Sequence, residues 1–181
     1  MLISCERRKE LMLGDSRYLK DMRMNLSSFL RSQDINKKEF YLLSTAIANN
    51  NNNELLQKAF AAKAKSENAS DAEIADALAC ASLMSANNVL YRFRHFMHKD
   101  SYDQMRAGMR MQIMQNPILG KEFFELISLA VSAVNGCELC VKSHEEAILK
   151  LGTTESRIFE AVKIAAVVTS VCKIEIGRAH V

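Results

Sequence analysis

The sequence predicts an all-α protein, and three observations support that fold class. The 181 residues include one proline and six glycines, which is too few for a loop-rich or all-β chain. Ala, Leu, Met, Lys and Glu are plentiful, and these residue types favour helices. Along most of the chain, apolar residues recur at the spacing of one helix face. The length fits one domain, or two closely packed halves, with a sizeable core.

Periodicity and capping define the first helices. Residues 1–18 carry charges without clear periodicity, so we expect a short helix or a loose N-terminal arm. Residues 18–30 place apolar side chains at helical spacing. An asparagine followed three positions later by glutamate forms a capping-box-like start and opens a helix over residues 36–48. The five consecutive asparagines at 49–53 predict a loop.

The middle of the chain contains one short and one long predicted helix. Residues 54–65 form an amphipathic segment, and the full capping box Ser-Asp-Ala-Glu opens a long helix over residues 70–98. Because of that length we expect a break near residues 85–88. Residues 102–114 are rich in methionine, which we expect to fill gaps in the core and not to ligate a metal.

The last third begins after the only proline. The Asn-Pro-Ile-Leu-Gly segment at 116–120 predicts a turn. Apolar spacing predicts helices over residues 121–134 and 137–151, the second of them ended by a glycine. A threonine cap opens the last helix, residues 154–176. We expect residues 177–181 to be a frayed tail.

An internal repeat divides the predicted helical domain, residues 19–176. Two pairs of segments match at nearly the same offset, namely 45–48 with 130–133 and 70–77 with 154–161. We therefore expect a duplicated helical unit, with a scaffold half at about 19–98 and a catalytic half at about 117–176. Only the second copy carries cysteines in the connection between its helices.

Composition and charge exclude several classes of protein. The net charge of +3 is too small to require an anionic partner, and the basic cluster at 92–95 is interpreted as an ion-pairing helix face, so no nucleic acid is expected. No apolar run has the length of a membrane span, and the N-terminus has no signal-peptide pattern. Five irregularly spaced cysteines do not form a secreted disulfide framework. A cytoplasmic protein is expected.

The candidate site is a pair of cysteines followed by a histidine. If the segment is helical, Cys137, Cys140 and His144 stand at i, i+3 and i+7 on one face. Glu125 lies twelve positions before Cys137 and is the nearest carboxylate on the preceding helix. Helix position favours Cys137 as the thiolate, whereas proximity to His144 favours Cys140. The spacing does not decide between them.

Three interpretations of the cysteine pair compete, and redox chemistry is favoured. A structural zinc site needs four ligands, and no second Cys or His pair exists. Haem attachment needs a histidine directly after the second cysteine, where Val141 stands. Two buried structural cysteines form the third possibility. We therefore expect no metal and no cofactor, an exposed Cys5, and small core residues at Cys80 and Cys172.

The residues around this pair resemble the alkyl hydroperoxidase D signature of the carboxymuconolactone decarboxylase-like superfamily. The signature consists of Glu125 followed by Ser-Ala-Val-Asn-Gly-Cys-x-x-Cys-x-x-x-His-Glu at 132–145. The similarity extends over about residues 19–171, including the segments 87–96, 106–117 and 158–161. It departs at Leu139, where a well-known member of the family has histidine.

The resemblance implies an all-helical fold with a duplicated core, a homotrimer, and a thiol-dependent peroxidase and disulfide reductase in antioxidant defence. Cys140 would attack organic hydroperoxides and become a sulfenic acid, and Cys137 would resolve it as a disulfide and supply a proton. Glu125 and His144 would form the proton relay. The implied partners are a peroxiredoxin, the alkyl hydroperoxide reductase C subunit, and a dihydrolipoyl acyltransferase as electron source.

Two other functions remain open. One is a decarboxylase-like acid–base enzyme that uses His144 and Glu125, with the thiols incidental. The other is a non-enzymatic thiol-exchange adaptor.

Overall fold

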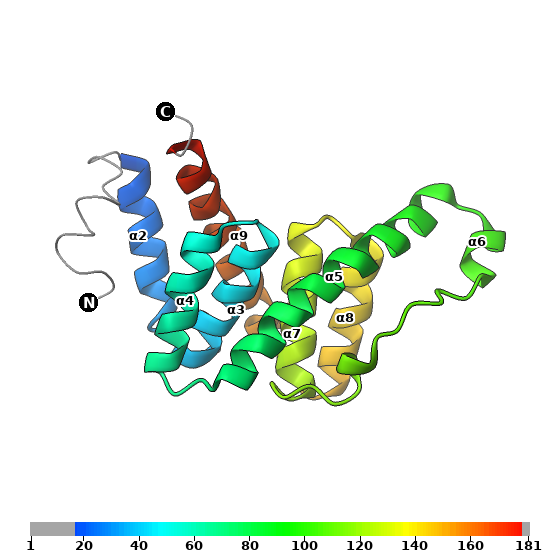
Figure 1. Ribbon diagram of the computed structural model, residues 1–181, viewed down its shortest axis with the longest axis horizontal. Coiled ribbons are helices and arrows are strands. Elements are labelled where there is room, and N and C mark those ends of the chain that lie inside the picture. Colours follow the sequence, from blue (N-terminus) through cyan, green and yellow to red (C-terminus); the bar gives the residue numbers. More distant parts are fainter. Residues whose placement is uncertain (1–16, 179–181) are drawn as a thin grey trace.

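The structure is all-α, as predicted (Figure 1). The computed structural model describes residues 17–178, with side chains described for residues 20–174. Within that part the elements are one short 3₁₀ helix at Gln112–Met114 and the α-helices α2 (Arg17–Phe29), α3 (Lys37–Asn50), α4 (Glu54–Ser66), α5 (Asp71–Met97), α6 (Asp100–Gln104), α7 (Lys121–Val134), α8 (Glu138–Lys150) and α9 (Glu155–Arg178).

The helix starts lie where capping chemistry predicts them. The side chains of Asn36 and Ser70 each accept a hydrogen bond from the backbone N–H three residues on. The Glu39 and Glu73 side chains in turn accept the backbone N–H of Asn36 and Ser70. Thr154 accepts a hydrogen bond from the Arg157 backbone N–H at the start of α9. The predicted helices over 36–48, 54–65 and 121–134 therefore match the observed ones within about two residues.

Two helical hairpins, α3–α4 and α7–α8, pack around α5 and α9. In Figure 1, α5 crosses diagonally from the α3–α4 hairpin to the α7–α8 hairpin, and α2 lies beside α9. The apolar faces of α3 and α7 form the centre, where Phe40, Leu43, Phe124 and Leu126 are fully or almost fully buried. This packing holds α7 and α8 side by side, so residues on the two helices can meet.

The long helix α5 is continuous, and the predicted break near residues 85–88 is wrong. The break is predicted from the length of the helix, and the residues at that position include Asn87 and Asn88, whose type favours turns over helix interiors. Both are buried, and the Asn88 side chain donates a hydrogen bond to Ser132 on α7. Tertiary contacts outweigh the weak local preference, and α5 ends only at His98, which adopts a left-handed conformation.

In the methionine-rich segment Met114 packs against the core, but Met105 and Met109 do not, which corrects part of a second prediction. Residues 105–111 form an irregular segment after the short helix α6, and Met105 and Met109 are exposed. Figure 1 shows this segment and the end of α5 projecting away from the rest of the molecule. Phe93 and Tyr102 pack edge to face in this projecting part, with ring centroids 5.1 Å apart, yet Phe93 is still 44% exposed.

The turns that end α3 and α7 follow the same backbone path. Residues 51–53 and 135–137 share their conformations, with a left-handed residue in the middle, Asn52 or Gly136. In both turns the N–H of the last residue donates to the carbonyl five residues earlier, and the N···O distance is 3.0 Å in each case. The asparagine run therefore forms a turn only at 51–53, since Asn49 and Asn50 complete α3. That the two units arose by duplication stays a prediction.

The chain ends fall partly outside the described residues. Residues 1–16 of the predicted arm and residues 179–181 of the predicted tail lie outside them. Helix α9 continues through Gly177 and Arg178, so the predicted tail is shorter than expected. Among the described helices, none combines the length and the apolar character needed to cross a membrane.

Candidate functional site

The candidate site begins at the turn between α7 and α8, residues 135–137, which we call the thiol turn. Gly136 has φ +69°, which is a left-handed conformation. This conformation is unfavourable in free energy for any residue that has a side chain. The Cys137 N–H donates to the carbonyl of Ser132, which closes the end of α7. Cys137 then occupies the N-cap position of α8, where the helix dipole favours a negatively charged group.

Cys140 stands one turn further into α8, and the structure places the sulfur atoms of Cys137 and Cys140 at disulfide-bonding distance. Their Cα atoms are 5.3 Å apart, which is within the range of natural disulfides. Both residues are buried, whereas Leu139 between them is 40% exposed. The pair therefore lies just beneath the surface, where a small oxidant or a partner's thiol needs little movement to reach it.

Glu125 and His144 form a close pair between the two helices. His144 Nδ1 lies 2.6 Å from Glu125 Oε2, and their side chains are only 11% and 6% exposed. An ionised Glu125 accepts this hydrogen bond from the Nδ1 hydrogen, which leaves Nε2 as the proton-accepting atom of the ring. His144 follows Cys140 by four residues on α8, so the two lie on the same helix face. This spacing brings together a thiol, an imidazole and a carboxylate.

Glu125 is held ionised by its neighbours. Burial by itself raises the pKa of this carboxyl, but the hydrogen bond with His144 and the charges of His144 and Lys121 outweigh it. The pKa of Glu125 is consequently below its ordinary value. Lys121 Nζ donates to the Met114 carbonyl and lies 3.5 Å from Glu125 Oε1, so it contacts the carboxylate oxygen that His144 does not.

The sequence did not predict the polar contacts that hold the thiol turn. The Asn135 side chain donates to Asn88 of α5 over 2.9 Å and exchanges hydrogen bonds with Asn50 of α3, while its carbonyl accepts from the Arg92 guanidinium. Asn88 also donates to Ser132 over 2.9 Å. Spacing reveals only that Asn88 and Arg92 share a helix face, and their partners lie more than forty residues away.

A histidine of α5 stands beside the first residue of α8. His95 Nε2 lies 3.6 Å from Glu138 Oε2, and Lys142 also pairs with Glu138. The pKa of the Glu138 carboxyl is lowered by the Lys142 hydrogen bond and charge and by the charge of His95. Arg92 and Arg94 of the basic cluster at 92–95 donate to backbone carbonyls, and among the described contacts only His95 meets a carboxylate, so the predicted ion-pairing face is wrong for the two arginines.

The other described cysteines are core residues, as expected. Cys80 and Cys172 are fully buried. Burial raises the pKa of the Cys80 thiol to about 12, although its contact with the Ser128 hydroxyl at 3.2 Å lowers it slightly. Such a thiol stays protonated and inert at neutral pH. Cys5 lies outside the described residues.

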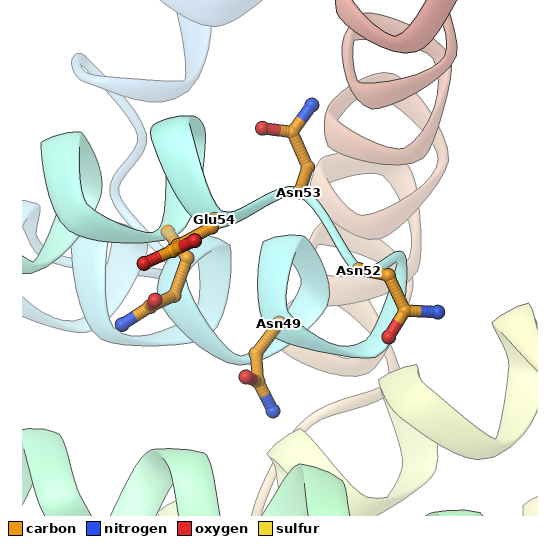
Figure 2. Close-up of a pocket in the computed structure, with 5 residues that line it drawn as sticks. Asn49, Asn52, Asn53 and Glu54 are labelled. Carbon is orange, nitrogen blue, oxygen red and sulfur yellow. The ribbon is translucent and has the colours of Figure 1, made fainter.

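Elsewhere in the described part of the chain there is no comparable arrangement. Among residues 17–178, no three His, Cys, Asp or Glu side chains gather closely enough to hold a metal ion. A pocket of about 240 Å³ lies over the turn after α3. Figure 2 shows that Asn49, Asn52 and Asn53 point in different directions there, so the polar groups do not converge on a ligand.

Comparisons with known proteins agree with this geometry. Residues 101–177, which contain the site, match the carboxymuconolactone decarboxylase family. Proteins named alkyl hydroperoxide reductase AhpD are similar over most of their length. One from Anaeromyxobacter dehalogenans strain 2CP-C is 42% identical over 82% of this chain and 80% of its own, and one from Streptomyces avermitilis is 42% identical over 85% and 86%. One from Rhodopseudomonas palustris strain BisB18 is 40% identical over 90% of each chain. The chain therefore belongs to the alkyl hydroperoxide reductase AhpD family, within the carboxymuconolactone decarboxylase family.

Proposed function

We propose that this protein is a thiol-dependent alkyl hydroperoxide reductase and disulfide reductase that acts in antioxidant defence. The observation that carries the proposal is the arrangement of Cys137 and Cys140 at bonding distance on the helix that also presents His144 to Glu125. Peroxide reduction needs a thiolate, a second thiol within reach and a group that moves protons. All three are present on the adjacent helices α7 and α8.

The reaction begins at Cys140. The Glu125–His144 pair accepts the Cys140 proton, and the thiolate attacks the terminal oxygen of the hydroperoxide. The O–O bond breaks, the alcohol leaves with a proton supplied by Cys137 or the relay, and Cys140 becomes a sulfenic acid. The sulfur of Cys137 then displaces that oxygen as water, and a disulfide forms. An external dithiol reduces the disulfide and resets the pair.

The assignment of the attacking thiol to Cys140 rests on its helix position and on family resemblance. His144 follows Cys140 by four residues on α8, and this spacing supports a base close to that thiol. Cys137 is the more deeply buried of the two, with 1% of its surface exposed against 6%. A resolving thiol needs to reach only its neighbour, so deeper burial suits Cys137.

We also propose the partners of the cycle. The oxidised substrate is an organic hydroperoxide or the disulfide of a peroxiredoxin, the alkyl hydroperoxide reductase C subunit, and electrons come from the dithiol of a dihydrolipoyl acyltransferase. The names of the similar proteins support the peroxide substrate. The partly exposed Leu139 between the cysteines gives a partner protein an apolar contact at the reacting sulfurs.

The proposed assembly is a homotrimer. The end of α5 and the segment after α6 expose the apolar side chains of Val89, Phe93, Phe96, Met105 and Met109. An exposed apolar surface of this extent is typical of subunit interfaces. Light scattering on the purified protein should give three times the chain mass, and Phe96→Glu should shift the assembly towards monomers. A monomeric wild-type protein would contradict the trimer.

The first test of the function uses fully reduced protein and one equivalent of an organic hydroperoxide. Intact mass and peptide mapping over time should show a rapid loss of two hydrogens that maps to Cys137 and Cys140. The buried thiol Cys80 serves as an internal control and should stay reduced. In Cys140→Ser no peroxide should be consumed, and full turnover by that variant would contradict the assignment.

The two alternative functions give different results in the same assay. Activity that survives in the double variant Cys137→Ser/Cys140→Ser would favour an acid–base enzyme that uses His144 and Glu125. Thiols that stay reduced with peroxide but exchange with a partner's disulfide would favour an adaptor.

A further inference from the structure

One face of α5 makes a series of contacts with the thiol turn and the residues on either side of it. Asn88, Arg92 and His95 recur at i, i+4 and i+7, so they lie on one side of the helix. Their respective partners are Ser132 at the end of α7, Asn135 in the thiol turn and Glu138 at the start of α8. The helix α5 therefore contacts the residues before, within and after this turn.

Arg92 has a particular place in this series. It binds the carbonyl of Asn135, the residue that ends α7, at the negative end of the helix dipole. Two residues later the chain reaches Cys137. The Asn135 side chain is held independently by Asn50 and Asn88. The Asn135 backbone is thus held by α5, and its side chain is held by both α3 and α5. Gly136 is the only residue between Asn135 and Cys137.

We propose that Arg92 is a positioning residue for the resolving step, because it holds the thiol turn where Cys137 can reach the oxidised Cys140. This inference rests on the proposed function. The step it governs is the attack of the Cys137 sulfur on the Cys140 sulfenic acid, in which an S–S bond forms, the S–O bond breaks and water leaves with the Cys137 proton. Both sulfurs belong to one chain, so the rate depends on how often they meet in the right geometry.

The preceding step does not depend on Arg92. Attack on the peroxide uses Cys140, His144 and Glu125, which stand on α8 and α7 below the turn, and none of the three has a hydrogen bond or ion pair with Arg92 among the described contacts. Loosening the turn should therefore slow the second step and leave the first unchanged. A sulfenic acid that is short-lived in the wild type should then accumulate.

The experiment measures how the Cys140 sulfenic acid divides between a chemical trap and the disulfide. Reduced wild type, Arg92→Met and Arg92→Lys are mixed with an organic hydroperoxide in the presence of dimedone, and adduct and disulfide are counted by mass spectrometry. We expect about tenfold slower disulfide formation in Arg92→Met, since small misplacements of reacting groups cost about that much or more. The adduct should rise in proportion. Arg92→Lys, which keeps a donor, should give an intermediate value.

Arg94→Met is the matched control, because Arg94 stands on the same helix but donates to the Met105 carbonyl in the arm. In this variant the Cys140 sulfenic acid should divide between dimedone adduct and disulfide in the same ratio as in the wild type. Equal adduct in Arg92→Met and the wild type would overturn the inference, as would a loss of peroxide consumption equal to the loss of disulfide. If Arg92→Met does not fold, the same comparison is made with Arg92→Lys. A wild type that forms neither adduct nor disulfide would overturn the proposed function itself.

Discussion

Replacing Glu125 by glutamine isolates the charge of the proposed proton relay. Glutamine has nearly the same size and can still accept a hydrogen bond from His144 Nδ1, so the ring keeps its orientation. What is lost is the negative charge that stabilises a protonated imidazole. Glu125 is 5% exposed, and its contact with His144 is only 2.6 Å long, so solvent screens that charge poorly.

The expected magnitude follows from the role of a general base. Such a group contributes about 10²- to 10⁴-fold to a rate. Because glutamine preserves the hydrogen bond, we expect the lower end of that range, about a hundredfold slower attack on peroxide. His144→Gln should cost a similar factor. The double variant should be little slower than either single variant, because the two groups act as one unit.

The assay is a single turnover of reduced protein with excess hydroperoxide, followed by quenching and counting of the Cys137–Cys140 disulfide. Lys142→Gln is a suitable control, since Lys142 pairs with exposed Glu138 on the same helix and not with the relay. Equal rates for Glu125→Gln and the wild type would refute the relay. Additive losses in the double variant would show that Glu125 and His144 act separately.

The same variant also changes the dependence of stability on pH. The pKa of Glu125 in the folded protein is below its value of 4.5 in the unfolded chain, so its ionised form stabilises the fold above about pH 4.5. That contribution is lost as the pH falls through the folded-state pKa. The difference in unfolding free energy between the wild type and Glu125→Gln should therefore shrink below pH 4.5, as measured by urea denaturation. A difference that grows on acidification would contradict the direction of the shift.

Three further predictions concern the framework of the site. Gly136→Ala should destabilise the fold by about 1 kcal/mol because the backbone is left-handed at this position. Gly136→Asn should cost less, since Asn52 holds the equivalent position in the other turn. Urea unfolding of both variants measures the difference. Arg157→Met should lower the unfolding free energy by about 3 kcal/mol, because Glu39 and Glu122 share this mostly buried partner at 2.7 and 3.0 Å; an unchanged urea midpoint would contradict it. Cys137→Asn should be about 1 kcal/mol more stable than Cys137→Ala under reducing conditions, because asparagine caps α8; equal stability would exclude capping at this position.

The parts of the fold that the sequence predicts are those set by local chemistry. Helix starts at Asn36, Ser70 and Thr154 follow from side chains that bond the backbone within three residues. The meeting of Glu125 and His144 could also be anticipated, because a short turn forces α7 and α8 to lie side by side. In each case the two groups concerned are close in the sequence.

The predictions that fail, and the features that were missed, depend on distant partners. The length of α5 suggested a break near Asn88, but Asn88 bonds with Ser132 and Asn135, and these contacts span 44 and 47 residues. Met105 and Met109 were expected in the core, but no helix of the described chain covers them. Arg92 belongs to a basic cluster by its sequence and becomes part of the site only through Asn135. Spacing in the sequence carries no information about such pairs.

The turn after α3 explains what the thiols add to the turn after α7. Asn53 occupies the N-cap of α4 with φ −102° and ψ 87°, and Cys137 occupies the N-cap of α8 with φ −97° and ψ 89°. The Asn53 side chain accepts the N–H of the third residue of its helix, Leu56, over 3.0 Å. In the oxidised geometry Cys137 makes no such bond, and the third residue of its helix is Cys140. We expect the Cys137 sulfur, once reduced, to take the place that Asn53 Oδ1 has in the other turn. An anion there is stabilised by the N-terminal N–H groups of α8. Residues 51–53 adopt the same backbone conformation without a disulfide, so the shape of the thiol turn does not require one.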